Sequence, residues 1–135
     1  VELFKGLIFL STRVDLTLGG PGSKVIIDLK SGRIYSNHRE DLRFYALVES
    51  LRSGQPPRRL ATYSLESARA DVEEVTEGVL QSAVRRVVDG ANAIYELTRE
   101  EREPKLNPGS QCRWCPLKET CETGKQFLER GFEDD

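Results

Sequence analysis

The sequence predicts an α/β fold, α+β in the strict sense, in which a mixed sheet with an antiparallel meander is flanked by helices. Two observations predict this class. Short runs rich in Val, Ile, Leu, Phe and Thr are separated by Gly- and Pro-containing turns, as strands are. Two longer segments repeat apolar residues at helical spacing. A sheet covered by helices buries both kinds of apolar surface.

Three strand-like runs open the chain. We expect strands at residues 2–10, 12–18 and 25–30, which are rich in β-branched and large apolar residues. Gly19-Gly20-Pro21-Gly22 ends the second run with the strongest turn signal in the sequence. The three runs therefore predict an antiparallel meander. Further strands are expected at 59–65 and, as a short edge strand, at 72–75.

Two helices are expected, over residues 39–53 and 77–97. Asn37 stands at the N-cap position of the first helix, with Glu40 three residues later, and Gly54 supplies its stop. The second helix follows Thr76 and carries one apolar stripe. We thus divide the chain into a core (1–98), a charged and Pro/Gly-bearing linker (99–111) and a cysteine segment with an acidic tail (112–135).

Length and composition describe one globular domain. The chain has 135 residues, of which 38% are hydrophobic and 31% charged. Its longest apolar stretches fall far short of the roughly 20 residues that span a bilayer, and no signal peptide pattern is present, so we expect no membrane association and a cytoplasmic location. The chain starts at Val1 and has no Met. We therefore expect an excerpt of a longer protein.

The charge is distributed unevenly. Residues 1–60 carry ten Lys and Arg against six Asp and Glu, whereas residues 61–135 carry ten against sixteen. A basic first half suits a polyanionic substrate such as nucleic acid, although an ordinary solvated surface gives the same count. The arginines concerned are Arg33, Arg39, Arg43, Arg52, Arg58 and Arg59.

An Asp-Leu-Lys sequence ends the third strand. Period-2 geometry puts Asp28 and Lys30 on one face of it and Leu29 on the other, and Asp15 lies on the preceding strand. Asp15 and Asp28 offer hard oxygen ligands to Mg²⁺, and the Leu29 carbonyl is a third candidate oxygen. Lys30 would then orient or deprotonate a water, or stabilise developing charge. Alone, the motif is also compatible with an exposed ion pair.

These residues in their context resemble the PD-(D/E)XK nuclease superfamily. The matching segments are Arg13-Val14-Asp15, residues 25–33 and residues 42–47. The resemblance implies a restriction-endonuclease-like fold, Mg²⁺ or Mn²⁺ held by Asp15 and Asp28, and a catalytic Lys30. It also makes Tyr45 a site residue, although Tyr45 lies on the apolar stripe of its helix and is equally a core candidate. Asp41 stands where the family usually has Gln, which leaves the role of that helix motif open.

Three cysteines, Cys112, Cys115 and Cys121, have the spacing of metal ligands. Zinc and iron–sulfur sites both need four ligands, so the fourth is His38, an exogenous group or sequence outside this chain. Three free thiols are the remaining alternative. A single histidine at a helix start is more often a solvated or capping side chain.

The cysteine segment resembles the C-terminal part of the iron–sulfur staple of RecB-like nucleases and of the related nuclease of CRISPR adaptation. That resemblance implies a four-iron four-sulfur cluster whose fourth ligand lies outside this chain, with Trp114 shielding it. The expected function is Mg²⁺-dependent cleavage of DNA from an end, in repair, recombination or CRISPR-type processing. The expected partners are DNA and the rest of a longer polypeptide or a helicase-like protein. The alternatives are a non-catalytic nucleic-acid-binding module and a zinc-stapled protein-interaction domain.

Overall fold

The computed structural model describes residues 1–3, 5–6, 8–99 and 102–130, so the expected acidic tail lies outside the described residues. The chain forms two compact units, Val1–Ala93 and Ile94–Asp135. Among the described residues, no helix combines the length and the apolar character needed to cross a membrane.

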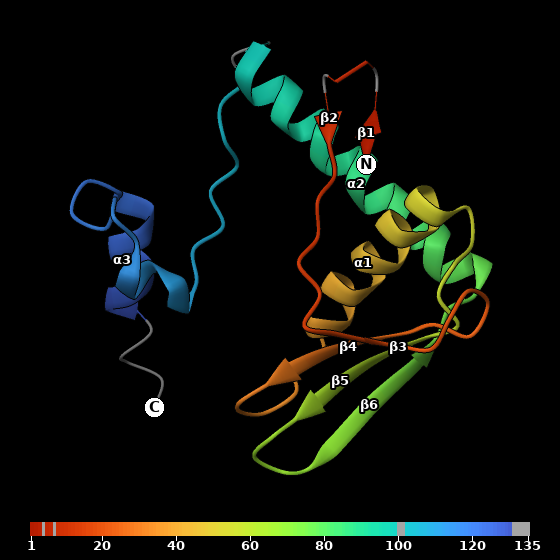
Figure 1. Ribbon diagram of the computed structural model, residues 1–135. Coiled ribbons are helices and arrows are strands. Elements are labelled where there is room, and N and C mark those ends of the chain that lie inside the picture. Colours follow the sequence, from red (N-terminus) through yellow and green to blue (C-terminus); the bar gives the residue numbers. More distant parts are fainter. Residues whose placement is uncertain (4, 7, 100–101, 131–135) are drawn as a thin grey trace. The chain divides into compact units, whose positions relative to one another are not determined.

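The first unit is built on a mixed sheet of four strands, in the order β3 (Leu16–Leu18), β4 (Val25–Lys30), β5 (Arg59–Ser64), β6 (Arg69–Glu74). The β3–β4 and β5–β6 pairs are antiparallel, whereas β4 and β5 are parallel (Figure 1). This is the mixed α/β architecture that the sequence predicts. It places β4, the strand that carries Asp28 and Lys30, in the interior of the sheet.

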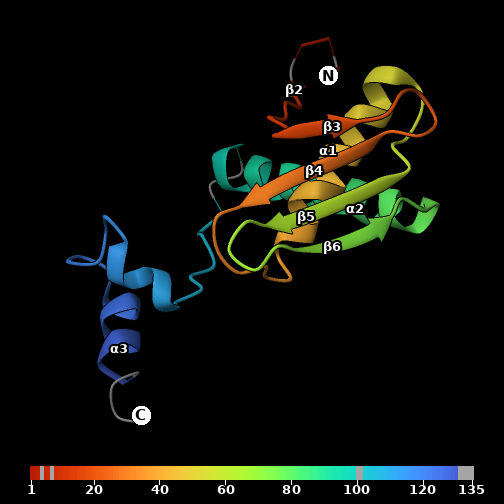
Figure 2. The same ribbon diagram turned by 60° about the horizontal axis from the view of Figure 1, so that its bottom comes forward.

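Helix α1 (His38–Ser53) connects β4 to β5 and packs on one face of the sheet. Its Leu42 and Ala46 form the centre of the core with Ile26 of β4 and Leu60 of β5. Helix α2 (Glu77–Arg99) adds Val79 and Leu80 to the same cluster, and Figure 2 shows both helices on the same side of the sheet. Parallel strands need such a crossover, because a tight turn cannot join them.

The N-terminal segment differs from the predicted strand over 2–10. It folds back on itself as β1 (Glu2–Leu3) and β2 (Ile8–Phe9), a two-stranded antiparallel sheet of its own. Lys5 and Gly6 both have positive φ angles, 56° and 85°, as the turn of a hairpin requires. The predicted three-stranded meander is therefore reduced to β3 and β4. The second run is strand only from Leu16.

Asn37 holds the predicted N-cap position of α1, but its side chain makes no capping bond. Instead, His38 Nδ1 accepts a hydrogen bond of 3.2 Å from the Tyr35 N–H. The His38 ring meets the Tyr35 ring edge-on, with centroids 5.5 Å apart. The end of α1 is as predicted: Gly54 is left-handed, with φ 74°, and its N–H bonds the Ser50 carbonyl at 2.9 Å.

The remaining elements differ from their predicted bounds by a few residues, and β5 ends at Ser64 rather than at residue 65. β6 covers Arg69–Glu74 rather than 72–75, and it is an edge strand as expected. Thr76 caps α2, since its Oγ1 accepts from the Val79 N–H at 3.3 Å, and α2 continues to Arg99. In the second unit a 3₁₀ turn, η1 (Ser110–Trp114), and a helix, α3 (Glu122–Arg130), were not expected from the sequence.

Candidate active site

The site is organised by β4 and faces α1. Ile26 is 1% exposed beneath α1, so the alternation of side chains along the strand puts Asp28 and Lys30 on the same, helix-covered face. Leu29 points to the opposite face and is 40% exposed. The apolar first half of β4 thus anchors the strand in the core, and its polar second half brings an acid and a base to the edge of that core.

Asp28 and Lys30 form a partly buried pair. Lys30 Nζ donates to Asp28 Oδ1 at 3.2 Å and lies 3.0 Å from Oδ2 without hydrogen-bond geometry. The hydrogen bond to Asp28 raises the pKa of Lys30, against a smaller opposing effect of burial, and the charges of Asp28, Asp41 and Asp15 raise it further. Lys30 is therefore a firmly protonated ammonium surrounded by three carboxylates.

Asp15 lies one residue before β3, next to the β4 pair. The register pairs Leu16 with Ile27, which places Asp15 beside the second half of β4. Its Oδ2 accepts a hydrogen bond of 2.9 Å from the Leu29 N–H. The two acids named from the sequence are thus brought together by antiparallel pairing, and Leu29 contributes its backbone N–H to Asp15.

Tyr45, on α1, lies near the same carboxylates. It is half-buried against the core cluster of Ile26 and Leu42, as its position on the apolar stripe predicts. Burial raises the pKa of its hydroxyl, and the charges of Asp28, Asp41 and Asp15 raise it further. Packing in the core and proximity to the carboxylates are therefore both properties of this one side chain.

One observation indicates that the carboxylates of Asp15 and Asp28 are suited to bind a divalent cation. Asp28 Oδ2 is buried and has no hydrogen-bond partner among the described residues. An unpartnered buried carboxylate oxygen is costly unless a ligand uses it. No group of three or more His, Cys, Asp or Glu side chains in the described ranges is arranged to hold an ion. Mg²⁺, however, is typically held by one or two carboxylates and keeps several waters, which Asp15 and Asp28 can satisfy.

Sequence reasoning missed Thr62 and two ion pairs on the same face of the sheet. Thr62 of β5 is in register with Asp28, and its Oγ1 is buried without a hydrogen-bond partner in the described part of the chain. Its position two residues after Leu60 was a signal, since both then face the core, but the parallel β4–β5 register was needed to place it. The ion pairs join α1 to β6 as Arg39–Asp71 and Arg43–Glu73.

The basic character of the first half is largely neutralised in the fold. Arg39 makes two hydrogen bonds of 2.7 Å to Asp71, and Arg43 bonds Glu73 and Glu40. The first unit as a whole carries thirteen Lys and Arg against twelve Asp and Glu. Charge excess alone therefore does not indicate a polyanion-binding surface. Four of the six arginines named from the sequence are paired with acids: Arg39, Arg43, Arg52 and Arg59.

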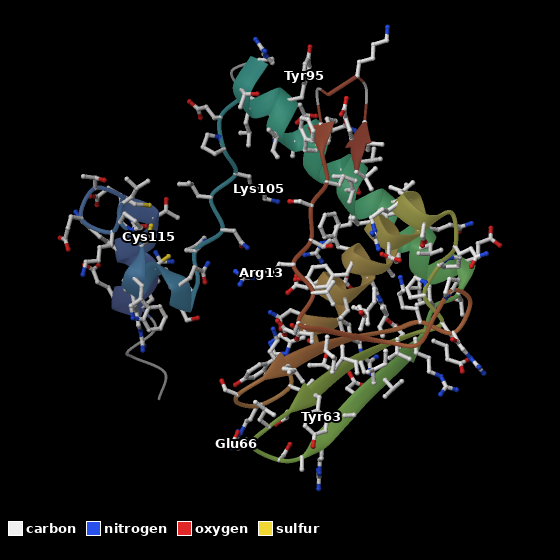
Figure 3. All side chains as sticks on the ribbon, in the orientation of Figure 1. Arg13, Tyr63, Glu66, Tyr95, Lys105 and Cys115 are labelled. Atoms are coloured by element: carbon white, nitrogen blue, oxygen red, sulfur yellow. The ribbon has the colours of Figure 1, made fainter. Side chains whose placement is uncertain are left out.

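The second unit gathers the three cysteines. They line one pocket of about 200 Å³, and Figure 3 labels Cys115 there, with sulfur in yellow. None is in a disulfide. The Gly109 N–H points to Cys112 Sγ at 3.5 Å and the Gly124 N–H to Cys121 Sγ at 3.4 Å. A Cβ at Gly124 would lie 3.5 Å and 3.6 Å from the sulfurs of Cys121 and Cys112. The three sulfurs line one pocket, but among the described residues they are not arranged as a group that holds a metal ion.

The comparison with known proteins agrees with the geometry of β4. The family model described as the PD-(D/E)XK nuclease superfamily matches residues 1–122, which include Asp15, Asp28, Lys30 and all three cysteines. A search of curated proteins finds no match. Because the match covers most of the chain and contains the Asp-Leu-Lys strand, this chain belongs to the PD-(D/E)XK nuclease superfamily.

Proposed function

We propose that the chain is the nuclease core of a divalent-metal-dependent enzyme that cleaves DNA. Superfamily members are generally phosphodiesterases and typically use Mg²⁺ or Mn²⁺. The observation that carries the proposal is the buried Oδ2 of Asp28, which has no hydrogen-bond donor, with Asp15 just before the adjacent strand and the Lys30 ammonium 3.0 Å away.

Each residue receives a role from its place in the site. Asp15 and Asp28 would hold the cation, and the Leu29 carbonyl remains a candidate third oxygen. The cation supplies charge neutralisation at the phosphate and a more acidic water. Tyr45 would donate a hydrogen bond from its hydroxyl at this face of the site, near the carboxylates that raise its pKa.

We assign Lys30 to charge stabilisation, because its ammonium lies at the Asp28 carboxylate, where the cation and a phosphate would meet. A protonated Lys30 orients a water or a phosphate oxygen and stabilises the negative charge that develops during hydrolysis. With 31% of its side chain exposed, Lys30 is accessible to a large substrate.

The test is DNA degradation in Mg²⁺ by the purified protein and its variants. Asp28→Ala and Lys30→Ala should each lower the rate by at least about a hundredfold, with circular dichroism spectra unchanged. Asp89→Asn, an acid on the exposed surface of α2, is the matched control and should keep full activity. Undiminished degradation by either site variant would refute the assignment.

We further propose a RecB-like subtype that degrades DNA from an end. The support is the cysteine pocket, in which three thiols have metal-ligand spacing and two of them receive N–H bonds. Linear DNA should be degraded and closed circular DNA spared, and equal loss of both would contradict end dependence. A helicase-like partner or further domain would supply unwound DNA.

The nature of the metal at the cysteines separates this subtype from its rivals. Anaerobically purified protein should contain iron and acid-labile sulfide, which Cys112→Ser and Cys121→Ser remove. Cys115 is the third ligand in this proposal. Zinc in place of iron would instead favour the protein-interaction alternative. Absence of both metals in protein that still degrades DNA would leave the cysteines as free thiols.

A further inference from the structure

Two buried oxygen atoms without hydrogen-bond partners lie on neighbouring strands at one level of the sheet. They are Asp28 Oδ2 on β4 and Thr62 Oγ1 on β5, and they are the side-chain atoms of this kind among the described residues. Asp28 and Thr62 are paired in the parallel register. Side chains paired in this way point to the same face, here the face under α1. The two unpartnered atoms therefore belong to one neighbourhood.

The two strand neighbours of Thr62 differ in what they leave for its hydroxyl. On its other side, Thr62 is paired with Asp71 of β6. Both oxygens of Asp71 already accept hydrogen bonds of 2.7 Å from Arg39. Asp28 Oδ2, by contrast, has no hydrogen-bond donor, although Lys30 Nζ lies 3.0 Å from it. Thr62 itself is 1% exposed, so bulk water does not satisfy its hydroxyl.

We propose that Thr62 is a further residue of the active site, and that its hydroxyl binds the water shell of the divalent cation held by Asp28. This inference rests on the proposed function, because it takes Asp28 as a ligand of the cation. A small, strongly hydrated cation keeps several waters. Each of these waters donates hydrogen bonds, because its lone pair faces the cation, and the Thr62 oxygen would accept from one of them. Thr62 is therefore a positioning residue: it orders water around the cation without touching it.

The experiment measures Mn²⁺ binding to the metal-free protein by the electron paramagnetic resonance signal of free Mn²⁺, with no DNA present. Thr62→Val keeps the branched shape and removes the hydroxyl, and it should weaken binding about tenfold. Thr62→Ser retains a hydroxyl and should keep most of the affinity. Thr17→Val, which removes an exposed hydroxyl on β3, is the matched control and should bind as the wild type does. If the Thr62→Val protein does not fold, Thr62→Ala and Thr62→Ser give the same contrast.

A purely structural Thr62 gives a different pattern. Removing a buried hydroxyl without a partner then raises the urea midpoint of the metal-free protein and leaves Mn²⁺ affinity unchanged, which would overturn the proposal. Tighter binding by Thr62→Val would overturn it as well, because the hydroxyl would then compete with the cation for Asp28. If the wild type binds Mn²⁺ no better than Asp28→Ala does, the proposed function itself fails. Wild-type binding that Asp28→Ala abolishes and Thr62→Val retains refutes the role of Thr62 alone.

Discussion

Gly54 ends α1 through a backbone conformation that glycine adopts easily. Its φ is 74°, and no atom lies within 4 Å of the place a Cβ would occupy, so the effect of a side chain there is conformational rather than steric. Gly54→Ala should lower the free energy of unfolding by about 1 kcal/mol. Gly90, inside α2 and equally uncrowded, is the control. Gly90→Ala should raise that free energy by roughly 0.5–1 kcal/mol. Urea unfolding measures both, and shifts of the same sign would contradict the assignment.

Tyr45 combines a packing role with a predicted site role, and a single substitution separates them. Tyr45→Phe keeps the ring against Ile26 and Leu42 and removes only the hydroxyl beside the carboxylates. It should change the free energy of unfolding by less than about 1 kcal/mol and lower the rate of DNA degradation by roughly tenfold or more. Tyr95→Phe, on an exposed part of α2, should change neither. Full activity of Tyr45→Phe would show that Tyr45 has a packing role and no role in the active site.

The sequence places Asp28 and Lys30 on one face of a strand because the signal for this is local. Asp28 and Lys30 share a face by strand geometry alone, and the structure places Asp15 beside them. Thr62 could not be found in this way, because its relation to Asp28 depends on which strands are neighbours and in which direction they run. Residue type and spacing indicate which side chains of one strand share a face. Which side chains of different strands are neighbours depends on how those strands pair.

At the scale of elements, α1 is held to β6 by one exposed ion pair, Arg39–Asp71, and one partly buried pair, Arg43–Glu73. The Arg43 hydrogen bonds lower the pKa of Glu73, against an opposing effect of burial. A lowered folded-state pKa contributes stability above the unfolded value near 4.5, and this contribution is lost as the pH falls through the folded-state pKa. The Arg43–Glu73 pair should therefore stabilise the protein at neutral pH and not in acid.

Glu73→Gln tests this pair. At pH 7 it should lower the free energy of unfolding by about 1–2 kcal/mol, and the difference from wild type should shrink as the pH falls below the unfolded value. Glu74→Gln is the control, because Glu74 is 69% exposed and pairs with Arg59 at 3.1 Å on the surface; its effect should stay below about 0.5 kcal/mol. Urea unfolding at a series of pH values gives both curves. A Glu73→Gln deficit that persists undiminished in acid would contradict the prediction.

Element types were predicted more reliably than element partners. The run at 2–10 has the composition of one strand, but Lys5 and Gly6 turn it into a hairpin, and Gly within a strand-like run is the signal that the prediction passed over. Asn37 has the residue type of a cap, yet His38 reaches back to Tyr35 instead. In both cases the chain adopts another local structure, a hairpin in the first and a His38–Tyr35 hydrogen bond in the second. Composition alone does not decide between these alternatives.

For the molecule as a whole, cation binding should be measurable as stability. A ligand that binds only the folded state adds about 2.7 kcal/mol when its concentration is a hundredfold above its dissociation constant. Mn²⁺ at that level should raise the free energy of unfolding of the wild type by this amount and leave that of Asp28→Ala unchanged. Chemical denaturation with and without Mn²⁺ measures the difference. An equal gain in both proteins would place the cation elsewhere.

The parallel pairing of β4 with β5 has a kinetic consequence. β3–β4 and β5–β6 are each joined by a short turn and can form early, whereas Val25 meets Arg59 only after the chain has closed through α1. Asp28 lies on β4 and Thr62 on β5, the two strands of this parallel pair. If β4 and β5 pair only after the transition state for folding, the complete cation site exists in the native state and not in the transition state. Mn²⁺ would then slow unfolding and leave the refolding rate unchanged, because it would stabilise the native state without stabilising the transition state.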